Sequence, residues 1–304
     1  MKAGNKHIWS VQGFTLVEML ATIAIIAILV SLLIPAVGYI RRTADNLKQK
    51  SQFQSIEMGL EGFRSDSSYG DYPESYFDIS IVDEGYCGAQ KLAEALVGLD
   101  GFGFHPQSIF KSDGTDGNGV PLYKPAVDGY IDSLPLTAAE KDAAKKANLA
   151  IRKGLYLELE TANVVKLWDL YGIGNTDILA GDTFVLADMF GKVKHIGTQK
   201  RTGMPILYFK ADTSKFLHDM GQRDDSTYDV HDSLELAFLS PPWDSSMSHP
   251  LFYPGSGEIF YDQTANPNFT LPVRPYRAES FILMSAGADG LYGTSDDVFN
   301  FDSE

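Results

Sequence analysis

One carboxylate stands where a charge is costly. Glu18 is the single charged residue in the otherwise apolar run of residues 14–40, and four basic residues flank this run: Lys2, Lys6, Arg41 and Arg42. About 20 apolar residues suffice to span a bilayer as a helix. A carboxylate within such a run costs about 2.5–3.5 kcal/mol on insertion scales. We therefore expect Glu18 to have a partner or a function of its own.

A second set of carboxylates lies near the C-terminus. Asp289, Asp296 and Asp297 occur among glycines between two predicted strands. Such oxygen-rich loops suit Ca²⁺, which accepts irregular cages of about six to eight oxygens, and the absence of soft ligands nearby argues against zinc or copper. We expect these three aspartates to bind calcium, with Ser285 and Asn300 as further candidate ligands. A solvated Asp/Gly turn is the alternative.

The N-terminal segment resembles the class III signal of type IV pilins and type II secretion pseudopilins. In these families a short basic leader ends in Gly, Phe usually follows, and Thr-Leu-Val/Ile-Glu comes next; residues 13–18 match this pattern position by position. A secretory signal peptide is disfavoured, because the run is too long and no A-x-A-like site follows Ile34 or Pro35. A plain transmembrane anchor remains the alternative, although it leaves Glu18 unexplained.

This resemblance implies a processing site and an assembly contact. A prepilin peptidase would cut between Gly13 and Phe14 on the cytoplasmic face, removing a leader of residues 1–13, and would then methylate the new amino group of Phe14. Glu18 would pair with the corresponding amine of a neighbouring subunit, since either charge alone is costly in an apolar setting. Pro35 lacks an N–H and is expected to kink the helix.

The acidic turn also resembles a known feature, the C-terminal calcium loop of the major pseudopilin. Ser285, Gly287, Asp289 and Gly290 match the opening of that loop, and the Asp296-Asp297 pair matches its later acidic cluster. The resemblance implies a structural role for Ca²⁺, which would hold the last strands in place.

Periodicity predicts an α+β fold built on one long helix. An apolar stripe of Leu47, Phe53, Ile56, Leu60 and Phe63 extends the helix beyond the membrane segment. We predict a helix over residues 15–64, within a stalk of residues 14–64 whose transmembrane segment covers about 14–40. The amphipathic half of this stalk is expected to pack on a small antiparallel sheet, under a globular head of residues 65–304. The head is expected to contain a small antiparallel sheet, with strands at 183–188, 205–211, 281–285 and 297–301. A large, mostly helical or loop insertion covers residues 74–182, with helices at 88–99 and, after a Thr137–Glu140 capping box, at 141–148.

Charge and motif content narrow the function classes. Residues 1–50 contain six Lys/Arg and two Asp/Glu, a balance of +4; subtraction from the whole-chain 25 and 40 leaves 19 and 38, or −19. So acidic a remainder argues against nucleic-acid binding. Cys87 is the only cysteine, which we expect to be a small buried hydrophobe, with an intermolecular bridge as the alternative. The acidic loop of residues 113–119 lacks the order of an EF-hand and is expected to be a polar turn.

No sequence motif indicates catalysis. The chain has no Gly-x-Ser-x-Gly, His-Glu-x-x-His, P-loop or paired-Cys motif, and its six histidines are scattered. We therefore expect a structural subunit of a type II secretion-like pseudopilus, held by the bacterial inner membrane with its head in the periplasm, and then packed with other pilin-like subunits into a fibre. A type IV pilin for adhesion, motility or DNA uptake is the first alternative, and a membrane-anchored enzyme or binding protein is the second.

Overall fold

The computed structural model describes residues 15–66, 70–78, 84–174, 176, 178–219, 221, 225–252 and 257–302. The chain divides into two compact units, Met1–Ala44 and Asp45–Glu304. Helix α1 spans Leu16–Asp66 and continues through Pro35, so the prediction of one helix over residues 15–64 is confirmed. Its second half belongs to the second unit, where it forms part of the core.

A three-stranded antiparallel sheet lies at the centre of the second unit. Its strands are β5 (Leu207–Lys210), β8 (Phe281–Ser285) and β9 (Val298–Phe299), in the order β5-β8-β9. Leu207 pairs with Met284, and Met284 pairs with Phe299. Three of the four predicted strand runs therefore meet in this sheet, and the fourth, 183–188, contains β2 (Phe184–Leu186), which pairs with β1 (Val164–Lys166).

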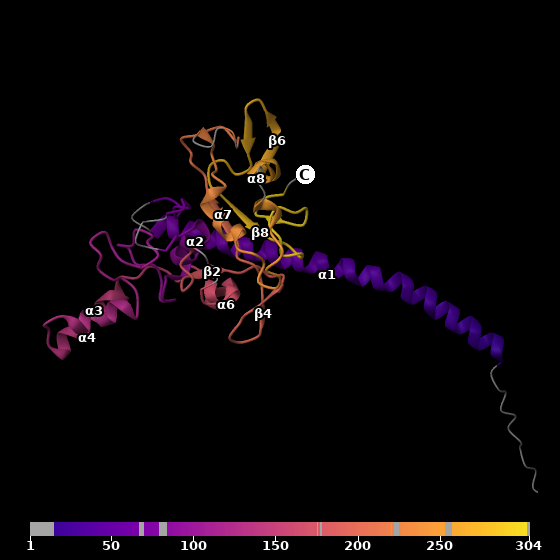
Figure 1. Cartoon of the computed structure of the whole chain (residues 1–304), viewed down its shortest axis with the longest axis horizontal. Coiled ribbons are helices and arrows are strands. Elements are labelled where there is room, and N and C mark those ends of the chain that lie inside the picture. Colours follow the sequence, from indigo (N-terminus) through magenta and orange to yellow (C-terminus); the bar gives the residue numbers. More distant parts are fainter. Residues whose placement is uncertain are drawn as a thin grey trace, which may run out of the picture. The chain divides into compact units, whose positions relative to one another are not determined.

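Both faces of the sheet are covered, as its alternating side chains require. On one face Tyr208, Phe281 and Leu283 join a buried cluster with α1 and with α2 (Gly88–Val97). On the other face the intervening residues pack with α7 (His231–Phe238) and α8 (Gly257–Thr264). Figure 1 shows α2, α7 and β8 gathered around the second half of α1.

The remaining elements are short. They are α3 (Ala126–Ser133), α4 (Ala138–Ala150), α5 (Leu159–Ala162), α6 (Leu167–Tyr171), η2 (Pro250–Phe252), and the paired strands β3 (Val193–Lys194) with β4 (Arg201–Thr202) and β6 (Ala265–Thr270) with β7 (Val273–Pro275). Helix α4 begins with the predicted capping box of Thr137 and Glu140. The sequence did not predict α7, α8 or the β6–β7 hairpin.

The buried stripe of α1 differs from its prediction at one end. Phe53, Ile56, Leu60 and Phe63 are at most 2% exposed, whereas Leu47 is 64% exposed. Gln49 and Gln52 are buried instead, because their side chains bond main-chain groups: Gln49 Oε1 accepts from the Met189 N–H at 2.8 Å, and Gln52 Nε2 donates to the Ala187 carbonyl at 2.9 Å.

The predicted insertion is in part a core element. All ten residues of α2 are buried, so this helix belongs to the packed centre even though it lies within residues 74–182. Cys87, which precedes α2, is fully buried and free, and burial raises the pKa of its thiol to about 11. It is the small buried hydrophobe that we expected.

Candidate functional site

Glu18 closes the first turn of α1. Its Oε2 accepts hydrogen bonds from the Thr15 N–H at 2.9 Å and from the Thr15 hydroxyl at 2.7 Å, while the Thr15 hydroxyl accepts from the Glu18 N–H at 3.3 Å. This reciprocal pair is a capping box, which satisfies donors that a helix N-terminus leaves unpaired. The carboxylate therefore already has a role within one chain.

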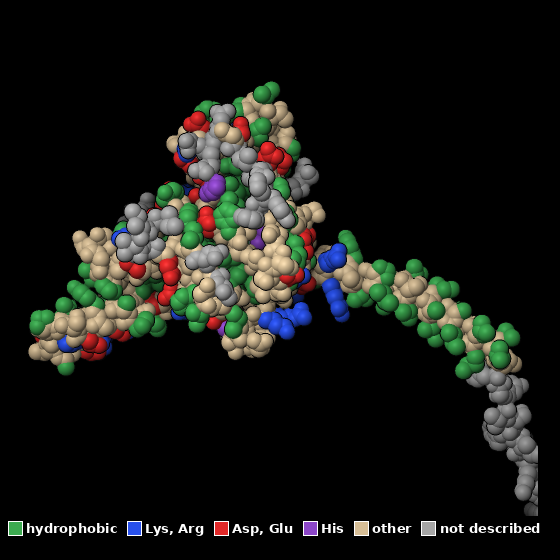
Figure 2. Space-filling view, viewed as in Figure 1, with side chains coloured by type: hydrophobic (Ala, Val, Ile, Leu, Met, Phe, Trp, Pro, Cys, Tyr) green, Lys and Arg blue, Asp and Glu red, His purple; other side chains and the backbone are tan. Residues whose placement is uncertain are grey.

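Exposed apolar side chains cover the first half of α1. Among the large ones, exposed fractions run from 38% at Val37 to 78% at Leu16, and by length and composition this part of the helix qualifies as a membrane span. Figure 2 shows hydrophobic side chains along this half and acidic side chains over the head. The predicted cleavage residues Gly13 and Phe14 lie outside the described residues, and the predicted kink at Pro35 stays a prediction.

The acidic turn between β8 and β9 brings two aspartates together. Asp296 Oδ2 accepts from the Asp289 N–H at 2.9 Å, and the two carboxyl groups interact directly. Burial and the neighbouring Asp296 raise the pKa of Asp289. Burial also acts to raise the pKa of Asp296, but the hydrogen bonds that Asp296 accepts from Thr294 and Asp289 outweigh this effect, so its pKa is lowered. The turn requires a glycine at position 287. Its φ is +65°, and the Cβ of any other residue there would lie 2.2 Å from the Asp296 carbonyl oxygen.

The carboxyl group of Asp297 is more deeply buried than those of Asp289 and Asp296. Its Oδ2 accepts from the N–H groups of Gly293 and Thr294, both at 2.8 Å, and from Gln263 Nε2 at 3.1 Å. Its Oδ1 is buried without a hydrogen-bond partner, and burial raises the pKa of this carboxyl to about 8. A buried carboxylate with one oxygen unpaired is a group that a cation would stabilise.

The two further candidate ligands have other partners. The Ser285 hydroxyl donates to Asp188 Oδ2 at 2.8 Å, while Asn300 accepts from the Leu283 N–H at 3.0 Å and donates to Glu57 Oε1 at 2.9 Å. Over the described ranges no group of three or more His, Cys, Asp and Glu side chains is arranged to hold a metal ion. Any cation at this turn would need main-chain carbonyls and water as well as carboxylates.

Asp188 is a buried acid that the sequence analysis missed. It is fully buried beside Ser285, and burial raises its pKa to about 7. The only signal was its place at the end of a predicted strand, where an acid is usually solvated. Asp232, in α7, is a second buried acid, and its carboxyl group accepts a hydrogen bond from the Ser75 hydroxyl.

Comparison with known proteins identifies the N-terminal segment. The family model described as the prokaryotic N-terminal methylation motif matches residues 10–34. No curated protein and no solved structure matches the chain. The chain therefore carries the class III signal of type IV pilin-like and pseudopilin precursors, and its apolar N-terminal helix fits membrane anchoring.

Proposed function

We propose that this chain is a pseudopilin of a type II secretion-like system. Prepilin peptidase would cleave it after Gly13 and methylate Phe14, and the processed stalk would pack with other subunits in a fibre that supports protein export. The observation that carries the proposal is the methylation motif at residues 10–34, with Glu18 in the first turn of a long apolar helix. The head would lie in the periplasm, attached to the inner membrane until assembly.

The two halves of α1 support a role as a fibre subunit. The first half exposes an apolar surface that lipid would cover before assembly and other stalks afterwards, while the second half is buried among residues of the second unit. In such a packed array the amine of Phe14 and the carboxylate of Glu18 would neutralise each other between subunits. Because Glu18 already bonds Thr15 within its own chain, it would hold that position before assembly.

We also propose a structural rather than a catalytic role for the head. The one acid of α2 supports this view: Glu94 is 0% exposed and accepts hydrogen bonds from the hydroxyls of Tyr86, Ser108 and Tyr123. Its full set of donors links α2 to two loops, as a packing group would.

Separate substitutions at the processing and assembly positions test the proposed function. In cells that contain the peptidase, Gly13→Ala should block cleavage, whereas Glu18→Gln should be cleaved but fail to enter fibres. Ser31→Ala, in the same apolar segment, is the matched control. Immunoblots would follow processing, and sheared fibres would measure assembly.

Export separates the two pilin-like alternatives. If the Glu18→Gln strain no longer secretes protein but still carries surface fibres, the chain is a pseudopilin. If the strain loses its surface fibres but exports protein normally, the chain is a type IV pilin. Normal fibre incorporation of an uncleaved chain would contradict both.

We propose in addition that the acidic turn binds Ca²⁺ through Asp289, Asp296 and Asp297. The close contact of two carboxyl groups and the unpaired Oδ1 of Asp297 support this. Bound Ca²⁺ would neutralise these charges and tie β9 to the loop that follows β8.

Thermal unfolding in calcium and in chelator tests this site. A ligand at about a hundredfold excess over its Kd stabilises the folded state by about 2.7 kcal/mol, so the melting temperature of the unsubstituted protein should rise by several degrees in calcium. Asp289→Ala and Asp297→Ala should lose this rise, and Asp113→Ala, in the other Asp/Gly loop, should keep it. Equal melting of the unsubstituted protein in both buffers would exclude the site.

A further inference from the structure

The hairpin of β3 and β4 is a basic projection on an acidic head. Residues 189–211 contain no Asp or Glu, whereas residues 51–304 together have a net charge of −19. Four exposed cations lie in or beside this hairpin: Lys192, Lys194, Lys200 and Arg201. Within the part of the chain that the structure describes, no carboxylate lies within 4 Å of these four side chains. The described residues therefore leave this positive charge without an ion-pair partner.

Two of these cations face each other across the hairpin. Lys194 pairs with Arg201, while the neighbouring pair, Val193 and Thr202, is buried, so the two cations point to solvent. Like charges directly opposite each other on adjacent strands are destabilising, and an anionic partner would relieve the repulsion. Ile196, in the connecting turn, is 49% exposed and adds an apolar contact. We call these exposed residues the basic tip: Lys194, Ile196, Lys200 and Arg201.

A second exposed hairpin, β6–β7, has an apolar end. Leu271 is 95% exposed, and Phe269 and Val273 are 48% and 40% exposed. Single exposed apolar side chains are common on protein surfaces, but several together on one element mark an interaction surface. Leu271 and Val273 also line a pocket of about 680 Å³ between the hairpin and α8.

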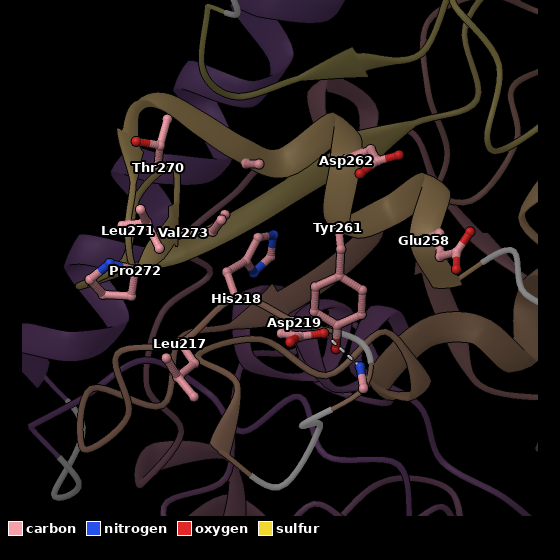
Figure 3. A pocket seen from close by; sticks show the side chains of 12 residues that line it. Leu217, His218, Asp219, Glu258, Tyr261, Asp262, Thr270, Leu271, Pro272 and Val273 are labelled. Carbon is pink, nitrogen blue, oxygen red and sulfur yellow. Dashed lines mark hydrogen bonds between the residues drawn. The ribbon is translucent and has the colours of Figure 1, made fainter.

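The other side of this pocket is acidic. Asp219, Glu258 and Asp262 line it, and the lining contains no Lys or Arg (Figure 3). These carboxylates and the apolar end of the hairpin form one surface, which complements a partner with exposed cations around an apolar residue. We call this surface the acidic face: Asp219, Glu258, Asp262, Leu271 and Val273.

The basic tip and the acidic face lie on opposite sides of the second unit. Figure 1 shows β4 and β6 at opposite ends of this unit, with β8 between them. A contact between the two surfaces therefore joins two copies, and each copy keeps its other surface for the next one. Heterologous contacts of this kind build open filaments when the rotation does not close a ring. A contact between two basic tips would instead place like charges together.

We propose that the basic tip of one copy binds the acidic face of a second copy of this chain. The cations of the tip would lie against the three carboxylates, and Ile196 would contact Leu271 and Val273. The inference deepens the proposed function, on which it rests for the fibre, by assigning the contact between neighbouring heads. Exposed ion pairs contribute little each, so the contact acts where anchored stalks hold the copies at high effective concentration.

Cysteine cross-linking between two differently tagged full-length copies tests the proposal. One copy carries Ile196→Cys and the other Leu271→Cys, and both are made in the same cells. Cys87 is the only native cysteine and is buried, so the unsubstituted chain is the blank. With a short bismaleimide we expect a cross-linked dimer of the two tags, in membranes or in sheared fibres. Ala143→Cys, at an exposed position of α4, replaces Leu271→Cys in the matched control and should give at least fivefold less dimer.

Charge reversal tests which groups make the contact. Reversal of the three cations on the Ile196→Cys copy should lower the dimer yield at least fivefold, and reversal of the three acids on the other copy should restore at least half of it. The substitutions on the first copy are Lys194→Glu, Lys200→Glu and Arg201→Glu. Those on the second copy are Asp219→Lys, Glu258→Lys and Asp262→Lys. Restoration would also show that both variants fold, because a misfolded chain cannot be rescued by its partner.

Three outcomes would overturn the proposal. The first is absence of the dimer from both membranes and fibres, and fibres that still form would then leave the proposed function standing. The second is an equal yield with Ala143→Cys, which would show random collision. The third is a loss on reversal that the reciprocal variant does not restore, which would show that the basic tip binds another anionic partner, such as lipid headgroups. Because cross-linking in membranes needs neither cleavage nor a fibre, failure of the proposed function alone would not abolish the dimer.

Discussion

Three buried aspartates make the stability of the head depend on pH near neutrality. Burial raises the pKa of Asp188 to about 7, of Asp232 to about 7 and of Asp297 to about 8, all from 3.8. Each folded-state pKa lies above the unfolded one, so the stabilising contribution is fully present below the unfolded pKa. It falls steadily above the unfolded pKa and is gone once pH has risen through the folded pKa, so the last part of it is lost between about pH 6 and 9.

We predict that the head is more stable at pH 6 than at pH 9 in chelator. Each group should cost about 1.4 kcal/mol of unfolding free energy for every pH unit between pH 6 and its folded pKa, and nothing further above that pKa. Asp188→Asn should flatten this dependence, because its amide oxygen still accepts from Ser285 and never ionises. Denaturant unfolding across the pH range measures the effect, with Asp142→Asn as the exposed control. Parallel curves for both variants would contradict the assignment to Asp188.

The sequence indicated some of these functional residues and did not indicate others. Glu18 and the three turn aspartates stood out because charge in an apolar run or among glycines is locally unusual. Asp188 did not stand out, since its chemistry comes from burial by residues distant in sequence. The hydrogen-bond partners of Ser285 and Asn300 could not be predicted for the same reason, because Asp188 and Glu57 come from other elements.

At the scale of elements, α1 lies very close to its neighbours in the second unit. A Cβ on Gly59 would be 2.9 Å from Leu96 Cδ2 of α2 and 3.1 Å from the Tyr156 carbonyl oxygen. A methyl group at position 59 would therefore require the Leu96 side chain to turn aside and the Tyr156 carbonyl to shift by a few tenths of an ångström.

We predict that Gly59→Ala lowers stability by about 1–3 kcal/mol through overpacking, although Ala favours helix over Gly by about 1 kcal/mol. Gly129→Ala is the matched control, because Gly129 lies inside α3 and a Cβ there has no atom within 4 Å. It should leave stability unchanged or raise it by up to about 1 kcal/mol. Urea unfolding of both variants measures the difference, and a stabilised Gly59→Ala would show that the helices can separate without cost.

Element prediction succeeded where local signals were strong. The repeated spacing of apolar residues predicted α1, and the capping box predicted α4. Runs of β-branched and aromatic residues predicted β5 and β8. The β6–β7 hairpin was missed because β6 reads Ala-Asn-Pro-Asn-Phe-Thr, which has the composition of a loop. Helices α7 and α8 have eight residues each, too few for a clear period, and they depend on packing against the sheet.

At the scale of the whole molecule, the second unit depends on the amphipathic half of the stalk, which was expected to pack on the sheet. The predicted head began at residue 65, whereas the second unit begins at Asp45. Four apolar residues between these positions fill the core: Phe53, Ile56, Leu60 and Phe63. Truncating each to Ala would cost about 2–5 kcal/mol, and the total approaches or exceeds the about 5–15 kcal/mol by which a domain is stable.

We therefore predict different behaviour for two fragments. A fragment of residues 45–302 should be soluble and unfold cooperatively in urea, because it keeps the core and lacks the apolar segment. A fragment of residues 71–302 should be unfolded or lack fixed tertiary packing, because it exposes the sheet face that α1 covers. Near-ultraviolet circular dichroism and urea transitions distinguish them. If the shorter fragment unfolded with the same midpoint as the longer one, α1 would be a stalk alone, and its buried residues would contribute nothing to the head.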